Sequence, residues 1–250
     1  MIKVLGVDDS ALIRKLLTEI ISREPDLHLV GTAASAFKAR DMVNLYEPDV
    51  ITLDIEMPKM DGLTFLSKLM IARPTPVVMI SSIAKEGAEA TLKALELGAV
   101  DFITKPRLDI VDGMHGYTKE IVDKIRAASQ ANIAKVKKVG QQSPSVSPKR
   151  DAALVALGAS TGGTEAIRTV LKSLPEDMPG IVVTQHMPAG FTESFAKRLN
   201  NACPLSVKEA EHGDVIESGC VYIAPGGYHL EVIKKSGRYT MLKIPGEIEK

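Results

Sequence analysis

Cysteine is scarce in this sequence, which has two, Cys203 and Cys220, among 250 residues. Their spacing matches neither a zinc-binding pattern nor a redox-active pair. A small secreted scaffold held together by disulfides is therefore excluded, and the pattern is typical of a protein from a reducing compartment.

An excess of charge of one sign is also lacking. Lysine and arginine together number 31, and aspartate and glutamate also number 31. Without net charge, no long-range field draws the chain toward nucleic acid or an anionic membrane surface. We therefore expect no nucleic acid among its partners.

The sequence has no apolar run long enough to span a bilayer, and residues 1–7 lead straight into a strand-like pattern without a signal peptide. We expect a cytoplasmic monomer with no membrane insertion. With 45% hydrophobic and 25% charged residues, the composition is that of a globular protein with true cores. A length of 250 residues is sufficient for two domains.

Short apolar segments alternate with helical patterns in the first half of the chain. Ser10 is placed to cap the first of these helices. Because the strands are apolar throughout and alternate with helices, they predict an α/β domain with a parallel sheet covered on both faces. We expect the flavodoxin-like strand order 2-1-3-4-5 for this sheet. The five strands are expected near residues 3–7, 27–30, 49–53, 76–80 and 100–103.

Polar residues gather at the carboxyl ends of these strands, where doubly wound sheets bind ligands. They are Asp8, Asp9, Asp54, Ser81 and Lys105. Strands one and three are neighbours in the predicted order, so the three aspartates converge and repel unless a hard cation such as Mg²⁺ neutralises them. Taken singly, Asp9 could be a helix cap and Asp54 an incidental strand-end residue, but this alternative does not account for five positions in register.

Together with Met57-Pro58-Lys59-Met60-Asp61-Gly62 and Lys105-Pro106, this pattern resembles a response-regulator receiver domain over residues 1–125. The resemblance implies that a histidine kinase phosphorylates Asp54. It also implies that Ser81 and Lys105 contact the phosphoryl group and that the bond before Pro106 is cis. The implied Mg²⁺ ligands are Asp8, Asp9, Asp54 and the backbone carbonyl of Glu56.

The pattern loosens after the last helix of this domain, to which Ile121, Val122 and Ile125 belong. Residues 141–148 are Ser-, Gln- and Pro-rich and cannot form a core, which predicts an extended tether. We therefore place a receiver domain at 1–125, a flexible linker at 126–150 and a second, partial doubly wound α/β domain at 151–250.

The second half is organised around Gly158-Ala159-Ser160-Thr161-Gly162-Gly163. An apolar run at 152–157 precedes it, and a helical pattern at 164–174 follows and ends at Pro175. A strand, a serine framed by glycines and a helix together form a nucleophile elbow, which exposes the hydroxyl beside a helix N-terminus. The alternative is a glycine-rich turn that binds phosphate or only connects two elements.

His186 follows the next predicted strand, residues 181–184. Consecutive parallel strands joined by a helix usually lie close together, so Ser160 and His186 are expected at the same edge of the sheet. There His186 can take the serine proton as a general base. A structural histidine is the alternative. Further strands are expected at 221–227 and 229–233, the latter paired with 239–244 in a hairpin.

A receiver followed by Gly158-Ala159-Ser160-Thr161-Gly162-Gly163 and Gln185-His186-Met187-Pro188 resembles the chemotaxis protein-glutamate methylesterase family. The resemblance implies hydrolysis of glutamate γ-methyl esters, and deamidation of glutamines, on the cytoplasmic domains of chemoreceptors. It makes Ser160 the nucleophile, His186 the base and Thr161 a supporting residue, with no cofactor in the esterase site. It also makes a chemotaxis histidine kinase the phosphoryl donor and phosphorylation the activating signal.

The family's third catalytic residue is an aspartate in a glycine-rich stretch well after the histidine. No such stretch is found here, and the one aspartate after His186, Asp214, does not match it. We therefore expect a truncated member of the family. Two hypotheses remain: a phosphorylation-gated methylesterase, or a phosphoryl-accepting receiver joined to an inactive catalytic domain.

Overall fold

A computed structural model describes residues 1–81, 85–105, 114–133 and 154–245. The chain divides into two compact units, residues 1–138 and 139–250, which we describe one at a time. Within the described ranges, none of the helices combines the length and apolar character that a bilayer crossing requires.

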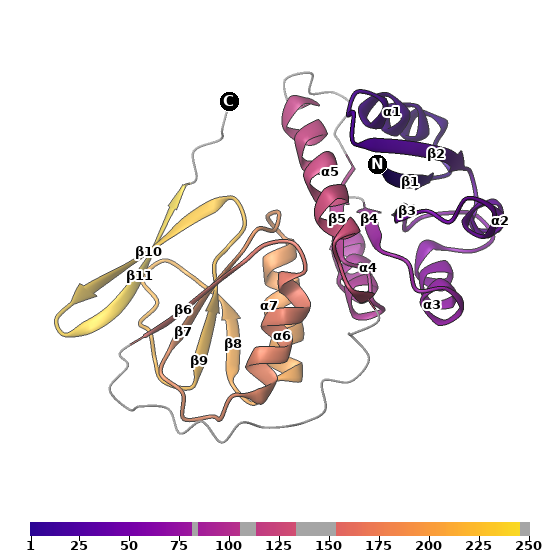
Figure 1. Cartoon of the computed structure of the whole chain (residues 1–250). Helices are drawn as coiled ribbons and strands as arrows, with labels where there is room; N and C mark the ends of the chain where they lie inside the picture. Colours follow the sequence, from indigo (N-terminus) through magenta and orange to yellow (C-terminus); the bar gives the residue numbers. More distant parts are fainter. Residues whose placement is uncertain (82–84, 106–113, 134–153, 246–250) are drawn as a thin grey trace. The chain divides into compact units, whose positions relative to one another are not determined.

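The first unit is built on a five-stranded parallel sheet (Figure 1). Its strand order, β2-β1-β3-β4-β5, confirms the order predicted from the sequence. Both ends of each strand lie within three residues of the predicted boundaries. The strands are β1 (Ile2–Val7), β2 (Leu27–Ala33), β3 (Val50–Asp54), β4 (Val77–Ser81) and β5 (Asp101–Thr104).

Five helices flank this sheet, and three of them, α1, α2 and α3, begin after a side chain that caps the first turn. The Ser10 hydroxyl accepts a hydrogen bond from the Ile13 amide, which confirms the predicted cap. The last helix runs four residues past the domain boundary predicted at residue 125. The helices are α1 (Ala11–Ser22), α2 (Ala36–Tyr46), α3 (Gly62–Ala72), α4 (Lys85–Glu96) and α5 (Met114–Ser129).

The main core of this unit lies between one face of the sheet and helices α1 and α5. Leu17 and Ile21 of α1 and Ile121 and Ile125 of α5 pack there against alternate strand residues such as Ile80. These side chains are almost fully buried. The packing fixes the carboxyl ends of β1, β3 and β5, which carry the predicted receiver site.

The second unit contains a four-stranded sheet in the order β6-β7-β9-β8, with every pair parallel. This confirms a second α/β sheet. Strand β8 was not predicted, because it has four residues, three of them polar, and lies at the edge of the sheet. The strands are β6 (Val155–Ala159), β7 (Ile181–Gln185), β8 (Ser206–Glu209) and β9 (Cys220–Ile223).

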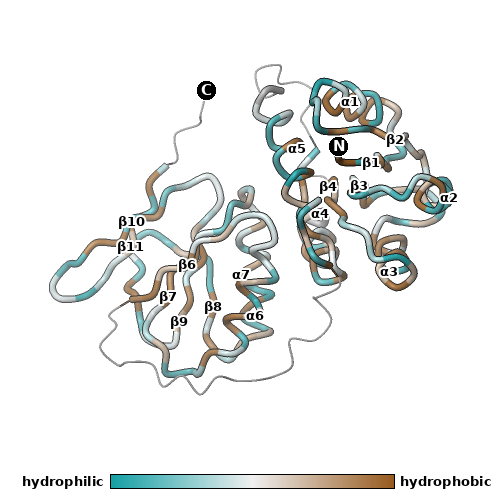
Figure 2. The backbone as a smooth tube through the Cα atoms, viewed as in Figure 1, coloured by the Kyte–Doolittle hydropathy of each residue, from teal (hydrophilic) through white to brown (hydrophobic). Residues whose placement is uncertain are grey.

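Helices α6 (Gly163–Ser173) and α7 (Phe191–Ala202) lie on one side of this sheet, and a hairpin lies on the other (Figure 1). The hairpin consists of β10 (Tyr228–Lys235) and β11 (Arg238–Pro245). It mixes hydrophilic and hydrophobic segments in Figure 2. Its fully buried Met241 packs against Val182 and Tyr222 of the sheet, so the hairpin covers part of the face opposite the two helices.

Candidate active sites

The first site lies at the carboxyl edge of the receiver sheet. Asp8 and Asp9 directly follow β1, and Asp54 is the last residue of the neighbouring strand β3. One carboxylate oxygen of each lies within 4.8 Å of those of the other two. The structure thus brings together the three carboxylates that the sequence predicted to converge.

Lys105 provides the cationic side of this cluster. Its Nζ donates a hydrogen bond to Asp54 Oδ2 at 2.8 Å and lies 3.5 Å from Asp8 Oδ2. Burial raises the pKa of Asp54 to about 6, and the charge of Asp8 adds to this rise, while Lys105 opposes it. Burial lowers the pKa of Lys105, but its bond to Asp54 and the charges of both carboxylates outweigh burial and leave that pKa raised.

The donor set fits a magnesium ion. Asp8 Oδ1 accepts a hydrogen bond from the Ser10 amide, whereas the buried Oδ2 has the ion pair with Lys105 at 3.5 Å but no hydrogen bond from any described residue. Burial also raises the pKa of Asp8, although Lys105 and the Ser10 amide oppose the rise, so the charged carboxylate is only partly compensated. A hard cation with oxygen ligands would supply the missing compensation. The Glu56 amide donates to Asp54 Oδ1 at 3.2 Å, and the role of its carbonyl as a ligand stays a prediction.

Ser81 ends β4 as expected, but its hydroxyl is engaged elsewhere. The side chain is buried, and its Oγ donates to the carbonyl of Gly87 in α4 at 3.2 Å. Contact with a phosphoryl oxygen would require this hydroxyl to leave Gly87, so the predicted role stays a prediction. The predicted cis bond involves Pro106, which lies outside the described residues.

Two further residues shape this site without having been singled out for it. Arg14 of α1 donates through Nη1 to the carbonyls of both Asp8 and Asp9, at 2.8 Å each, and so holds the turn that carries the two carboxylates. Gly62, the first residue of α3, leaves room for the end of β3, because a Cβ there would lie 2.0 Å from the Asp54 carbonyl oxygen. Gly62 is the last residue of the Met57–Gly62 motif, so the sequence contained a signal for it.

The second site lies at the carboxyl edge of the sheet in the other unit. Ser160 directly follows β6 and is exposed, and helix α6 begins three residues later at Gly163. Gly162 adopts a positive φ of 74°, which favours glycine, and the Gly163 amide donates to the Ser160 carbonyl at 2.7 Å. The strand, sharp turn and helix match the predicted elbow.

His186 follows the adjacent parallel strand at the same level. Ala159 of β6 is paired with Gln185 of β7. Ser160 follows the first of these residues and His186 the second, so the two lie at the same level of the sheet edge. The His186 amide donates to the Ala159 carbonyl at 3.4 Å, and its side chain is exposed. Within the described part of the chain, no side chain is hydrogen-bonded to the His186 ring.

Asp214 does not orient this histidine in the structure. Its carboxylate lies 3.0 Å from Lys208 Nζ and accepts a hydrogen bond from the Glu211 amide at 2.8 Å. These contacts close a local turn after β8. The prediction that Asp214 is not the third catalytic residue agrees with this placement.

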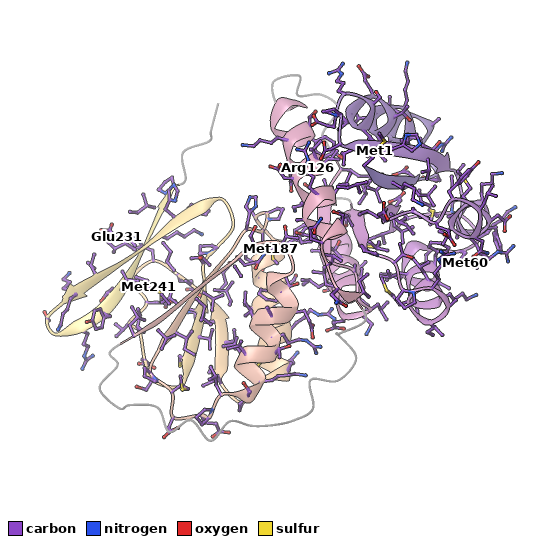
Figure 3. All side chains as sticks on the ribbon, in the orientation of Figure 1. Met1, Met60, Arg126, Met187, Glu231 and Met241 are labelled. Carbon is purple, nitrogen blue, oxygen red and sulfur yellow. The ribbon has the colours of Figure 1, made fainter. Side chains whose placement is uncertain are left out.

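The loop after His186 is held by a second loop. Thr192 is fully buried at the start of α7; its hydroxyl bonds to Glu209 and accepts the Gly226 amide at 3.1 Å. A Cβ at Gly226 would lie 2.5 Å from the carbonyl carbon of Pro188, so the two loops pack backbone against backbone. Met187, labelled in Figure 3, is buried within this arrangement, which restrains the chain next to His186.

Comparisons with known proteins cover both units. A family described as CheB methylesterase matches residues 155–248, and the response regulator receiver domain family matches residues 4–112. A protein-glutamate methylesterase/protein-glutamine glutaminase of Cupriavidus pinatubonensis is 53% identical over 244 residues, covering 96% of this chain and 68% of the relative. One from Pseudomonas aeruginosa is 54% identical over 247 residues, covering 96% and 69%.

Among solved structures, the response regulator domain of Thermotoga maritima CheB is 44% identical and covers 53% of this chain and 98% of that domain, with a TM-score of 0.49. The chain thus spans about two thirds of the length of the two curated relatives. More than half of the aligned residues are identical to those of these relatives, and the receiver family matches the first half of the chain and the methylesterase family the second. The chain belongs to the protein-glutamate methylesterase/protein-glutamine glutaminase family, with a response-regulator receiver domain followed by a methylesterase domain.

Proposed function

We propose that this chain hydrolyses glutamate γ-methyl esters on chemoreceptors, under control of phosphorylation at Asp54. The observation that carries the proposal is the register of β6 and β7, which sets Ser160 and His186 after paired residues of adjacent parallel strands. The names of the relatives supply the substrate class, including deamidation of glutamine side chains.

Ester hydrolysis follows from these two residues by acyl transfer. His186 accepts the hydroxyl proton as Ser160 Oγ attacks the ester carbonyl, and the oxyanion forms next to the start of α6. Collapse of this intermediate breaks the bond to the methoxy group, which leaves as methanol with the proton from His186. Water, deprotonated by His186, then attacks the glutamyl ester on Ser160; the bond between the acyl carbon and Ser160 Oγ breaks, His186 returns the proton to Oγ, and the glutamate is released.

The receiver unit accepts the controlling phosphoryl group. Asp8, Asp9 and Asp54 would hold Mg²⁺, which when bound neutralises negative charge around the incoming phosphoryl group. An oxygen of Asp54 attacks phosphorus, the bond to the donor breaks, and Lys105 is close enough to Asp54 to pair with the new anion. A chemotaxis histidine kinase is the proposed donor, and the acyl phosphate relieves inhibition of the esterase.

The deciding experiment is methanol release from methylated receptor, with and without a small-molecule phosphoryl donor and Mg²⁺. We expect release that rises with the donor, disappears in Ser160→Ala and no longer responds to the donor in Asp54→Asn. Absence of methanol while Asp54 still becomes phosphorylated would contradict the esterase.

A second candidate function is a receiver that accepts phosphoryl groups without catalysis in its second unit. It is favoured by the His186 ring, which has no hydrogen-bonded side chain among the described residues. An imidazole without an orienting partner loses much of its power as a base. In that case Ser160→Ala would leave the adaptation of cells unchanged, whereas Asp54→Asn would alter the phosphoryl flow from the kinase.

A further inference from the structure

Gln185 connects the two strand ends that carry Ser160 and His186. It is the last residue of β7, opposite Ala159. Its side-chain amide nitrogen donates to the Ser160 carbonyl at 3.0 Å and lies 3.5 Å from the His186 carbonyl. In the sequence it is the first residue of the Gln185-His186-Met187-Pro188 motif, which by itself assigns it no role.

The start of α6 is shaped to accept this side chain. A Cβ at Gly163 would lie 2.1 Å from Gln185 Oε1, so only glycine at this position leaves room for the Gln185 side-chain amide. Oε1 itself is buried and has no hydrogen-bond partner among the described residues. Burial of an unpaired acceptor is unfavourable, so the hydrogen bonds and packing of the rest of the side chain must hold it there.

The Ser160 carbonyl therefore accepts two hydrogen bonds, from Gln185 Nε2 at 3.0 Å and from the Gly163 amide at 2.7 Å. A trans peptide group is planar, and its carbonyl and its N–H point in opposite directions. Two donors that fix the Ser160 carbonyl therefore also fix the Thr161 N–H, which is directed away from Gln185 and Gly163.

We propose that Gln185 is a positioning residue that orients the Thr161 N–H as a donor to the oxyanion formed at Ser160. This inference rests on the proposed ester hydrolysis. In a nucleophile elbow, the amide after the nucleophile is placed to bind the oxyanion. A donor fixed in advance stabilises that charge without reorganising during the reaction. Gln185 touches neither substrate nor reacting atoms and acts through the Ser160–Thr161 peptide.

Kinetics test the catalytic consequence. Gln185→Met keeps the length of the side chain and removes the donor, and Thr184→Val, at the exposed preceding residue, is the matched control. We expect kcat for methanol release to fall about 10-fold or more in Gln185→Met, with KM nearly unchanged, because the lost interaction is made in the transition state. Thr184→Val should stay near the unsubstituted chain. An unchanged kcat, or an effect confined to KM, would overturn the proposal.

Nuclear magnetic resonance separates this inference from the proposed function. In the unsubstituted chain, the Gln185 side-chain amide should exchange hydrogen with water more slowly than that of exposed Asn201. The Thr161 amide resonance should move in Gln185→Met but not in Thr184→Val. Exchange as fast as that of Asn201, or an unmoved Thr161 resonance, would refute the positioning role of Gln185. Slow exchange of the Gln185 amide together with a shifted Thr161 resonance, but no methanol release, would refute the esterase and still support the positioning role of Gln185.

Discussion

Asp54 makes the stability of the receiver unit depend on pH, because this carboxyl is 1% exposed and its pKa is raised from 3.8 to about 6. Burial is the main cause, and the nearby charge of Asp8 adds to it. The folded chain therefore binds this proton more tightly than the unfolded chain does. The contribution of Asp54 to stability is largest below the unfolded pKa, near 4, and is lost as the pH rises toward about 6.

The substitution Asp54→Asn tests this assignment in the absence of Mg²⁺. It removes a buried charge at neutral pH but replaces an already neutral group in acid. We therefore expect the gain in Tm over the unsubstituted chain to be larger near about pH 7.5 than near about pH 4.5. The measurement is thermal unfolding followed by circular dichroism at both pH values. An equal gain at the two pH values would contradict the raised pKa.

Gly62 is a second residue on which the receiver site depends. A Cβ there would lie 2.0 Å from the Asp54 carbonyl oxygen and 2.9 Å from the Ile55 Cα, both backbone atoms that cannot rotate away. We expect Gly62→Ala to destabilise the unit by about 1–3 kcal/mol. Denaturant unfolding measures this loss, with Gly116→Ala as the control, because nothing lies within 4 Å of a Cβ at that position. Equal stability of the two variants would refute the crowding.

Residue types at strand ends were sufficient to predict the acidic cluster, since parallel strands bring their carboxyl ends to one edge. The partner of a flexible side chain could not be predicted in the same way. Arg14 binds two carbonyls, and Ser81 binds the Gly87 carbonyl, through geometry that exists only after α1 and α4 have packed. Gln185 belongs to the same class.

At the scale of elements, helix α3 owes its start to Asp61. The carboxylate accepts the Thr64 amide at 2.7 Å and the Thr64 hydroxyl at 2.9 Å. The hydrogen bond from the Thr64 amide is the main reason that the pKa of Asp61 is lowered. Ser35 caps α2 more weakly, with 3.4 Å between its hydroxyl and the Lys38 amide.

We expect Asp61→Ala to cost about 1 kcal/mol at neutral pH and Ser35→Ala less. Because the pKa of Asp61 is lowered in the folded chain, its contribution is present above the unfolded value of 3.8 and is lost as the pH falls below it. The two variants should therefore converge in acid. Urea unfolding at several pH values checks this, and a larger loss for Ser35→Ala would contradict it.

Strands and helices with strong patterns could be predicted, and the adjacency of β6 and β7 followed from their connecting helix. Strand β8 could not, because its sequence Ser206-Val207-Lys208-Glu209 has one buried apolar residue. The hairpin itself was predicted, but the alternation of β10 and β11 does not state which sheet face they cover. That choice depends on Met241 reaching Val182 and Tyr222.

At the scale of the whole molecule, each of the two units has its own buried core. We expect calorimetry to resolve two unfolding transitions, of which Mg²⁺ raises only the one that belongs to the receiver, since the three carboxylates lie there. Asp54→Asn should reduce this rise without moving the second transition. A single transition that shifts as a whole on adding Mg²⁺ would show that the units unfold together.

The Gly87 carbonyl accepts two hydroxyl hydrogen bonds, and this bears on how readily Ser81 can rotate. It accepts hydrogen bonds from the Ser81 hydroxyl at 3.2 Å and from the Thr91 hydroxyl at 2.6 Å. When Ser81 turns away, Thr91 still satisfies this buried acceptor, so the turn leaves no unpaired group at Gly87. We therefore expect a fraction of unphosphorylated molecules to hold Ser81 turned away from Gly87. Under the proposed function, phosphorylation would then enrich an orientation of Ser81 that the unphosphorylated chain already samples, and would not have to create a new one.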